Sequence, residues 1–238
     1  MNSSLDTETN RRILVVDDEQ SIRLGIKLAL SQSSDWEIDT EASPSTALKL
    51  LKSKHYDAMI LDLRMPEMDG LTLARMQSDQ GIFCPTVLSS AFANTDIVLS
   101  AILVGIVDFM TKPMDLTELR ATVQHLLWRH RRFSNLHINE IKELSLNNQY
   151  ECAKYYLQQR NRVQAKQILL DLLEQKMDEN SELLLGIIAE LEKSYDLAER
   201  YYTEACSRGK KPPFKPFQSK LVSKDKATEK RFVLHAKK

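Results

Sequence analysis

Short apolar runs that end in charged or hydroxyl side chains constrain this chain more than any other feature. Residues 13–16 run directly into Asp17-Asp18-Glu19, and residues 58–61 run into Asp62. Apolar runs of this length between polar segments are typical of strands buried on both faces of a parallel sheet. Because the carboxyl ends of parallel strands lie at one edge of the sheet, we expect these carboxylates to converge there.

Two further apolar runs have polar ends of a complementary kind. Residues 85–88 lead into a segment that contains Ser90, and residues 108–110 lead into a segment that contains Lys112. Converging carboxylates repel one another, so their site favours a cation, and an all-oxygen site suits Mg²⁺. With Asp62 as nucleophile, Ser90 as hydrogen-bond donor and Lys112 as counter-charge, this edge has the parts of a phosphoryl-transfer site.

Residues 11–130 resemble the receiver domain of two-component response regulators. The motifs that carry the resemblance are, in chain order, Asp17-Asp18, Asp62 followed by Met65-Pro66 and Met68-Asp69-Gly70, Ser90-Ala91, and Phe109 before Lys112-Pro113. The resemblance implies a flavodoxin-like, doubly wound α/β fold in which a partner histidine kinase or phosphotransfer protein phosphorylates Asp62. Each motif alone is common at strand ends and in loops, but the complete set favours an active phosphoacceptor.

The same resemblance assigns a cofactor site. It implies that Mg²⁺ is held by Asp18, Asp62 and the backbone carbonyl of Arg64, with Asp17 helping mainly through water. Arg64 and Phe92 are larger than the residues most common at their positions and could overhang the route of water to the phosphoryl group. We therefore hypothesise slow self-dephosphorylation; in the alternative, both side chains point into solvent.

The resemblance also assigns a switch. It implies that Ser90 and Lys112 bind the phosphoryl group, and that the Phe109 ring swings inward as the Ser90 hydroxyl moves toward that group. The face formed by the fourth helix and the fifth strand is expected to change with it. The chain is therefore expected to be a regulatory switch rather than an enzyme, with limited self-phosphorylation and self-dephosphorylation chemistry at Asp62.

Helix signals separate the apolar runs. Capping residues predict helices from Ser43-Pro44 to about residue 54, from Gly70 to about residue 78, and from Asn94 or Thr95 to about residue 104. A further helix begins at Asp115, and its apolar stripe continues to Phe133. We expect this helix, residues 115–137, to extend past the first domain as a linker that packs on the second domain or on a sister chain.

Residues 138–208 are expected to form a helical output domain with an internal repeat. The repeat spacing is 33 residues, and the first copy aligns with the second at the positions Ala153, Ala165, Leu169 and Leu172, then Gly186, Ala198, Tyr202 and Ala205. Small residues at the first two positions of each copy would let paired helices approach closely. This pattern resembles the tetratricopeptide repeat, and a plain pair of helical hairpins is the alternative. Two repeats rarely stand alone, so the linker helix, a tail helix or dimerisation must cover their ends.

The net charge of zero hides a division along the chain. Residues 208–238 carry 11 Lys and Arg against two acids, which leaves 22 basic and 31 acidic residues before them. Residues 1–10 are expected to be a disordered lead without the regions of a signal peptide, and residues 209–238 a basic tail. The three Cys and five His show no ligand spacing, and no apolar run is long enough to span a membrane; both features favour a cytoplasmic location.

These features favour an output that binds a protein target through the helical domain. The alternative is a regulator that binds nucleic acid through the basic tail and the linker arginines Arg129, Arg131 and Arg132. An output enzyme is disfavoured because no metal-binding cluster, nucleophile elbow or nucleotide-binding loop follows residue 138.

Overall fold

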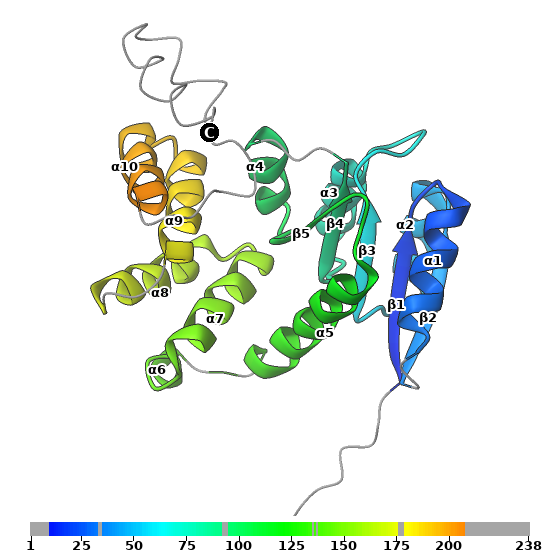
Figure 1. The fold of residues 1–238 in the computed structure, drawn as a ribbon, viewed down its shortest axis with the longest axis horizontal. Helices are drawn as coiled ribbons and strands as arrows, with labels where there is room; N and C mark the ends of the chain where they lie inside the picture. The colour runs from blue at the N-terminus through cyan, green and yellow to red at the C-terminus, as the bar shows by residue number, and fades with distance from the viewer. Residues whose placement is uncertain are drawn as a thin grey trace, which may run out of the picture.

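The structure is a computed structural model that describes residues 10–32, 35–91, 95–134, 136, 138–175 and 179–207. Within these residues an N-terminal α/β domain is followed by a helical domain, which lies beside the β5 edge of the sheet (Figure 1). The sheet has five parallel strands in the order β2-β1-β3-β4-β5. The strands are β1 Arg11–Val16, β2 Trp36–Glu41, β3 Ala58–Asp62, β4 Thr86–Ser90 and β5 Asp108–Thr111. The predicted doubly wound fold is confirmed.

The central strands β3 and β4 are buried along their whole length because helices cover both of their faces. Every residue of β3 and β4 is buried. Ile13 and Val15 of β1 pack toward one face, with α1 Gln20–Leu30 and α5 Leu116–Phe133. Leu14 and Val16 pack toward the other face, with α2 Pro44–Ser53, α3 Gly70–Asp79 and α4 Thr95–Leu103. This alternation follows from the two-residue period of a strand.

Side-chain caps start the helices where the sequence places them. The Ser43 side chain accepts a hydrogen bond from the Thr46 amide, and Pro44 occupies the first helical position of α2. Asp69 caps α3 and Asp115 caps α5 in the same way, each through its carboxylate. The α5 helix ends at Phe133 rather than at residue 137, and its second half packs against α7.

The helical domain repeats itself at the spacing that the sequence predicts. After the short α6 Ile138–Ile141 come α7 Leu146–Gln158, α8 Arg162–Glu174, α9 Glu179–Leu191 and α10 Tyr195–Ser207. The second helical hairpin, α9 and α10, starts 33 residues after the first at each helix. Even the turns repeat, because Arg160 and Lys193 both adopt a left-handed backbone with φ of 59° and 61°.

The small residues of the repeat permit close helix packing. A Cβ added at Gly186 would lie 2.6 Å from Cε1 of the buried Tyr202, so only glycine leaves room for this ring. The equivalent residues are buried as well: Ala153, Ala165, Leu169, Leu172, Ala198 and Ala205. The internal repeat is therefore present in the structure, while its assignment as a tetratricopeptide repeat stays a prediction.

The two domains share a continuous apolar core. Val98 and Ile102 of α4 belong to the same buried cluster as Cys152 of α7 and Ile188 of α9. Gly105 allows the backbones to approach closely, because a Cβ there would lie 2.6 Å from the Gln158 carbonyl oxygen. Among the described residues, no helix has both the length and the apolar character needed to cross a lipid bilayer.

Candidate functional site

Asp62 lies at the carboxyl end of β3, and its carboxylate is held from two sides. The residue is only 4% exposed. Oδ2 accepts a hydrogen bond of 2.8 Å from the Arg64 amide, and Oδ1 lies 2.6 Å from Nζ of Lys112. The loop that follows turns back so closely that a Cβ at Gly70 would lie 2.3 Å from the Asp62 carbonyl oxygen. The strand end and this tight loop together fix the position of the carboxylate.

Lys112 joins the ends of three strands. Its Nζ lies 2.8 Å from Oδ2 of Asp17, which follows β1, and thus bridges this carboxylate and that of Asp62. Its backbone amide donates a 2.9 Å hydrogen bond to the carbonyl oxygen of Ser90 at the end of β4. The Lys112–Pro113 peptide bond is cis. The structure therefore brings Asp17, Asp62 and Lys112 to one edge of the sheet.

The charges at this edge are unequal. Burial raises the pKa of Asp62 above its ordinary value, and the hydrogen bond from Lys112 offsets only part of that rise. Burial acts to lower the pKa of Lys112, but its hydrogen bonds to Asp17 and Asp62 outweigh it, so this pKa is raised. One ammonium therefore faces two buried carboxylates, and the site favours further positive charge.

The ligand atoms available at the carboxyl ends of these strands are oxygens, the atoms that a magnesium ion prefers. Asp18 has an exposed side chain, and its backbone carbonyl accepts a hydrogen bond from the Arg23 guanidinium. Over the residues that the structure describes, no His, Cys, Asp and Glu side chains form a ready group of three or more around one point. Lys112 instead lies between Asp17 and Asp62. Hard oxygen donors with excess negative charge suit Mg²⁺ better than a softer metal.

The remaining predicted residues lie around this edge at different depths. Ser90 is buried, and it pairs with Thr111 in the sheet register. Phe109 is half-buried and packs against both the core of the α/β domain and the core shared with the helical domain. Arg64 is exposed, and Phe92 lies outside the described residues. The hypothesis that Arg64 and Phe92 restrict water therefore stays a prediction.

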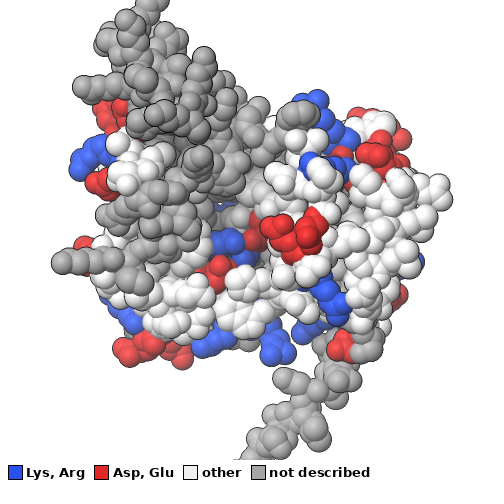
Figure 2. All heavy atoms as spheres, in the orientation of Figure 1, with Lys and Arg blue, Asp and Glu red and all other residues white. Residues whose placement is uncertain are grey.

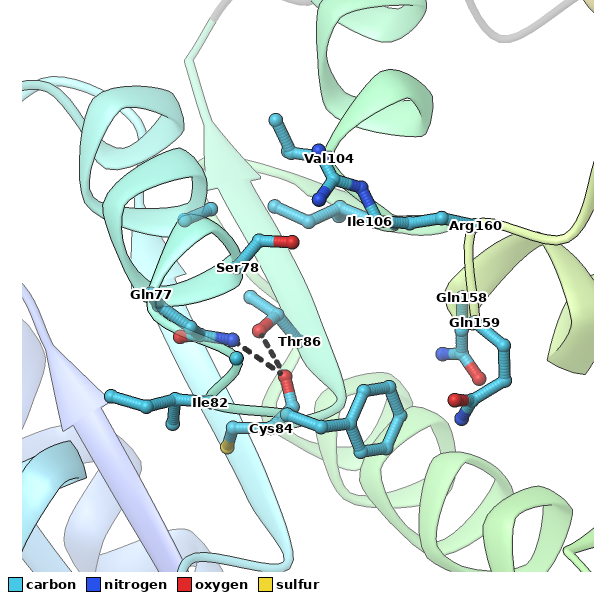
Figure 3. Close-up of a pocket in the computed structure, with 14 residues that line it drawn as sticks. Gln77, Ser78, Ile82, Cys84, Thr86, Val104, Ile106, Gln158, Gln159 and Arg160 are labelled. Carbon is cyan, nitrogen blue, oxygen red and sulfur yellow. Dashed lines mark hydrogen bonds between the residues drawn. The ribbon is translucent and has the colours of Figure 1, made fainter.

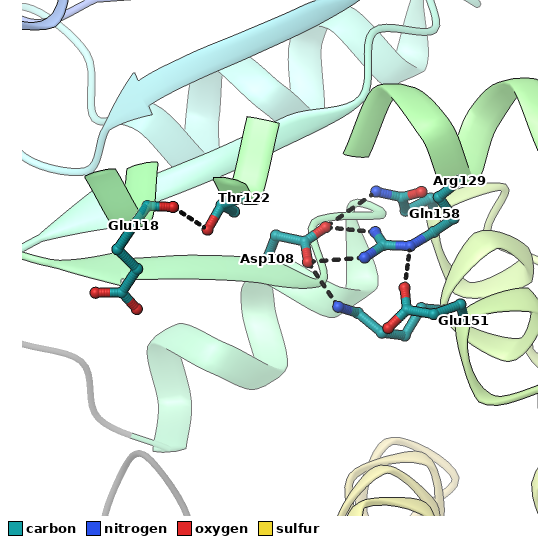
Figure 4. A network of polar contacts seen from close by, with 7 residues as sticks. Asp108, Glu118, Thr122, Arg129, Glu151 and Gln158 are labelled. Atoms are coloured by element: carbon teal, nitrogen blue, oxygen red, sulfur yellow. Dashed lines mark hydrogen bonds and ion pairs between the residues drawn. The ribbon is translucent and has the colours of Figure 1, made fainter. Parts of the chain in front are cut away.

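A second polar cluster, which the sequence did not predict, lies between the domains (Figure 4). Arg129 of α5 is 1% exposed, and its guanidinium makes paired contacts of 2.6 and 3.1 Å with the Asp108 carboxylate of β5. Its Nε lies 2.7 Å from Oε2 of Glu151 on α7. Lys154 and Gln158, also on α7, reach Asp108 at 2.6 and 3.3 Å. The alternative that placed Arg129 in a nucleic-acid interface is wrong for this residue, because Arg129 is buried and its charge is neutralised inside the protein.

This interdomain cluster stays ionised because it is internally balanced. Burial acts to raise the pKa of Asp108, but Lys154 and Arg129 outweigh it and hold this pKa well below its usual range. Two acids and two bases from β5, α5 and α7 thus meet in one buried place.

On the described part of the face drawn in Figure 2, basic and acidic side chains lie side by side rather than in a single basic patch.

A cleft of about 190 Å³ also lies between the domains, away from Asp62 (Figure 3). Its walls include Gln77 and Thr86 on one side and Gln158 and Arg160 on the other. Thr86 begins β4, whereas Asp62 ends the neighbouring parallel strand β3. The cleft therefore lies near the amino ends of the strands, whereas the carboxylates converge at their carboxyl ends. We place the chemistry at the carboxyl ends.

Comparisons with known proteins agree with this geometry. Residues 13–124 match the model of the response regulator receiver domain family. Regulatory protein AtoC of Escherichia coli is 34% identical over 116 residues, which are 49% of this chain and 25% of that protein. Transcriptional regulatory protein PmrA of Pectobacterium parmentieri is 34% identical over 140 residues, 58% of this chain and 62% of that protein. The chain thus spans less than two thirds of the length of these relatives.

A solved structure shows the same fold. The crystal structure of a signal receiver domain from Vibrio parahaemolyticus superposes with a TM-score of 0.50 at 22% sequence identity. The match covers 54% of this chain and 99% of that one. At 22% identity, this match shows only that the sheet and its helices are arranged in the same way.

Proposed function

We propose that Asp62 accepts a phosphoryl group from a partner histidine kinase or phosphotransfer protein, because residues 13–124 match the model of the response regulator receiver domain family. The observation that carries the proposal is the buried Asp62 carboxylate with Lys112 Nζ at 2.6 Å. A carboxylate at a strand end, fixed by the Arg64 amide and faced by a cation, is oriented for attack on phosphorus.

The transfer uses residues that the sheet edge already brings together. One carboxylate oxygen of Asp62 bonds to phosphorus as the phosphorus–nitrogen bond of the donor phosphohistidine breaks, and the leaving imidazole takes up a proton. Lys112 then pairs with the phosphoryl oxygens, and the Ser90 hydroxyl donates a hydrogen bond to them. Asp18, Asp62 and the Arg64 carbonyl, supported by Asp17, would hold Mg²⁺, which when bound neutralises charge on the phosphoryl group.

We propose that the helical domain delivers the output by binding a protein target. Its two hairpins with a 33-residue spacing form the kind of surface that helical repeats present to partners. The basic segment of the nucleic-acid alternative, residues 209–238, lies outside the described residues. Binding of DNA or RNA that weakens steeply with salt, and that is lost when residues 209–238 are deleted, would favour that alternative.

Labelling of the whole chain tests the phosphoacceptor. The purified protein is incubated with acetyl phosphate and Mg²⁺, and the phosphorylated fraction is separated on a phosphate-affinity gel. We expect labelling of the wild type and of the control Asp39→Asn, which alters an acid on β2, and none of Asp62→Asn. An unlabelled wild type, or equal labelling of Asp62→Asn, would refute the proposal.

The cellular setting follows from the same proposal. A chain that receives its phosphoryl group from a histidine kinase must meet the kinase domain, and we place it in the cytoplasm for that reason. Cys84, Cys152 and Cys206 are free, as expected for a reducing compartment.

A further inference from the structure

The cleft of about 190 Å³ takes no part in the proposed phosphoryl transfer (Figure 3). It is lined by α3 and the loop that leads to β4, by residues 104–106 after α4, and by residues 158–160 between α7 and α8. A cavity of about 150 Å³ holds a benzene molecule, whereas drug-sized ligands need about 300–1,000 Å³. The cleft therefore has room for one ring with small substituents.

Apolar side chains form much of the wall. Ala74 of α3 and Val104 and Ile106 beside α4 are buried in the core of the α/β domain, and all three line the cleft. Phe83, in the loop before β4, is 37% exposed, and its ring centroid lies 5.3 Å from that of His130. A flat apolar group would be removed from water between such walls. An aromatic ring has this shape and can contact the Phe83 ring.

Arg160 gives the cleft its charge. Of the described residues that line the cleft, it alone has an ionised side chain. Its Nε donates a hydrogen bond of 3.3 Å to the Leu103 carbonyl oxygen, which holds the guanidinium beside the cleft. Figure 3 shows the side chain reaching from the α7–α8 turn toward Val104. A guanidinium presents several N–H groups in one plane, and a carboxylate accepts two of them at once.

Two buried amides supply hydrogen-bond acceptors. Gln77 and Gln158 line the cleft from different domains, and no described residue donates a hydrogen bond to the side-chain oxygen of either. Their nitrogens are already engaged, because Gln77 Nε2 donates to the Cys84 carbonyl oxygen and Gln158 Nε2 to the Asp108 carboxylate, both at 3.3 Å. A buried acceptor without a donor is unfavourable, so a ligand hydroxyl or amine that donates to either oxygen would gain binding free energy.

Other ligand classes fit these walls less well. A cation would meet Arg160 without a counter-charge, because no carboxylate lines the cleft among the residues that the structure describes. A bare inorganic anion would pair with Arg160 but would leave the apolar walls uncovered. A neutral ring would cover those walls but would gain nothing from the guanidinium.

We propose that this cleft is a second ligand site, and that its ligand is a one-ring aromatic acid with a hydroxyl or amine substituent. The carboxylate pairs with Arg160, the ring packs against the apolar wall and Phe83, and the substituent donates to Gln77 or Gln158. Because the ligand contacts both domains, its binding stabilises the arrangement in which they form the cleft. The chain would then respond to a small metabolite as well as to a phosphoryl donor, and the inference does not depend on Asp62.

Calorimetric titration of the full chain with matched small molecules tests the ligand class. We expect para-hydroxybenzoate to bind with a dissociation constant below about 1 mM, which is reasonable for about ten non-hydrogen atoms. Phenol lacks the carboxylate and should bind about 10- to 100-fold more weakly, and benzoate lacks the hydroxyl and should bind about 2- to 10-fold more weakly. Inorganic phosphate is the probe for a general anion site.

Variants of the α7–α8 turn test the position of the site. Arg160→Met should weaken binding of para-hydroxybenzoate about 10- to 100-fold, whereas Arg160→Lys keeps the charge and should retain part of the affinity. The matched control is Arg162→Met, which removes an exposed arginine that does not line the cleft and should leave binding unchanged. Circular dichroism checks that each variant is folded. If Arg160→Met is not folded, Arg160→Lys and the series of probes decide.

Hydrogen–deuterium exchange locates the bound probe. With saturating para-hydroxybenzoate we expect slower exchange in residues 77–86 and 158–160, on both sides of the cleft. Absence of saturable binding by para-hydroxybenzoate, binding that Arg160→Met leaves unchanged, or protection confined to other segments would overturn the proposal. Phosphate that binds as tightly as para-hydroxybenzoate would overturn the aromatic class. Labelling of Asp62 by acetyl phosphate is measured separately, so this inference and the proposed function can fail independently.

Discussion

Removing the Arg129 guanidinium is the most severe single change that the structure suggests. Arg129→Met keeps the volume of the long buried side chain but removes its charge from between Asp108 and Glu151. Asp108 retains Lys154 and Gln158, whereas Glu151 loses its contact with Arg129 inside the protein. Breaking a buried ion pair by removing one partner costs about 3–5 kcal/mol. We expect a loss of this size, since Arg129 is 1% exposed and solvent cannot compensate.

Urea unfolding measures this loss. With a denaturant slope of about 2 kcal/mol per molar urea, a loss of about 3–5 kcal/mol lowers the midpoint by about 1.5–2.5 M. Circular dichroism follows the helices, and fluorescence of Trp128, which packs edge-on against Phe133, follows the interface. Arg132→Met is the matched control, because Arg132 is exposed on the same helix and should change stability by less than about 0.5 kcal/mol.

Replacement of the whole cluster separates charge from packing. In the quadruple variant Asp108→Leu/Arg129→Met/Glu151→Leu/Lys154→Met no charge of the cluster remains, so no uncompensated charge is buried. Stability should return close to that of wild type, as in other proteins whose buried ion networks were replaced by apolar residues. A midpoint shift of Arg129→Met below about 0.5 M, or a quadruple variant less stable than the single one, would refute this reasoning.

Two further predictions concern packing and pH. Gly186→Ala should cost about 1–2 kcal/mol of stability and lower Tm by about 2–8 °C, because the new Cβ would lie 2.6 Å from the buried Tyr202 ring. The control Gly25→Ala on α1, where a Cβ would have nothing within 4 Å, should be neutral or stabilising. Equal changes of Tm for the two variants in calorimetry would contradict this prediction. Burial lowers the pKa of His130, with His55 and Arg11 acting in the same direction and Asp57 against it. The folded protein therefore binds fewer protons here than the unfolded chain, so this contribution to stability is complete above about pH 6.5 and is lost as pH falls below it. The urea midpoint of His130→Phe should fall less than that of wild type between about pH 7.5 and pH 5.5, and parallel curves would exclude His130 as the cause.

The sheet edge could be predicted from sequence because its signals are local. Each apolar run carries its polar end with it, and parallel pairing then brings Asp17, Asp62 and Lys112 together without knowledge of distant contacts. Strand β2 and helix α1 received no individual prediction. In β2 only Ile38 is buried, and the signal available was a weak alternation of apolar and polar residues from Trp36 to Glu41.

The interdomain cluster could not be predicted because its partners are distant in sequence. Asp108 contacts residues 21 to 50 positions away, and by itself it begins an ordinary apolar run. Arg129 lies in a basic segment that is typical of an exposed helix face. Its spacing from Leu126 and Phe133, three and four residues, was the one available sign that it belongs to the buried stripe. The next residue, His130, lies at the flank of that stripe and is only half-buried.

The docked arrangement also explains how so short a helical repeat is covered. Stacked repeats bury a continuous core, and two of them leave apolar ends that another element must cover. Here α5 packs against α7 and α4 against α9, so the receiver supplies that cover within the same chain. Release of the helical hairpins would expose the apolar surface that now contacts Val98, Ile102 and Phe133. If the helical domain binds a protein target, as we propose, a target that covers this surface would compete with α4 and α5 for the same face of α7 and α9.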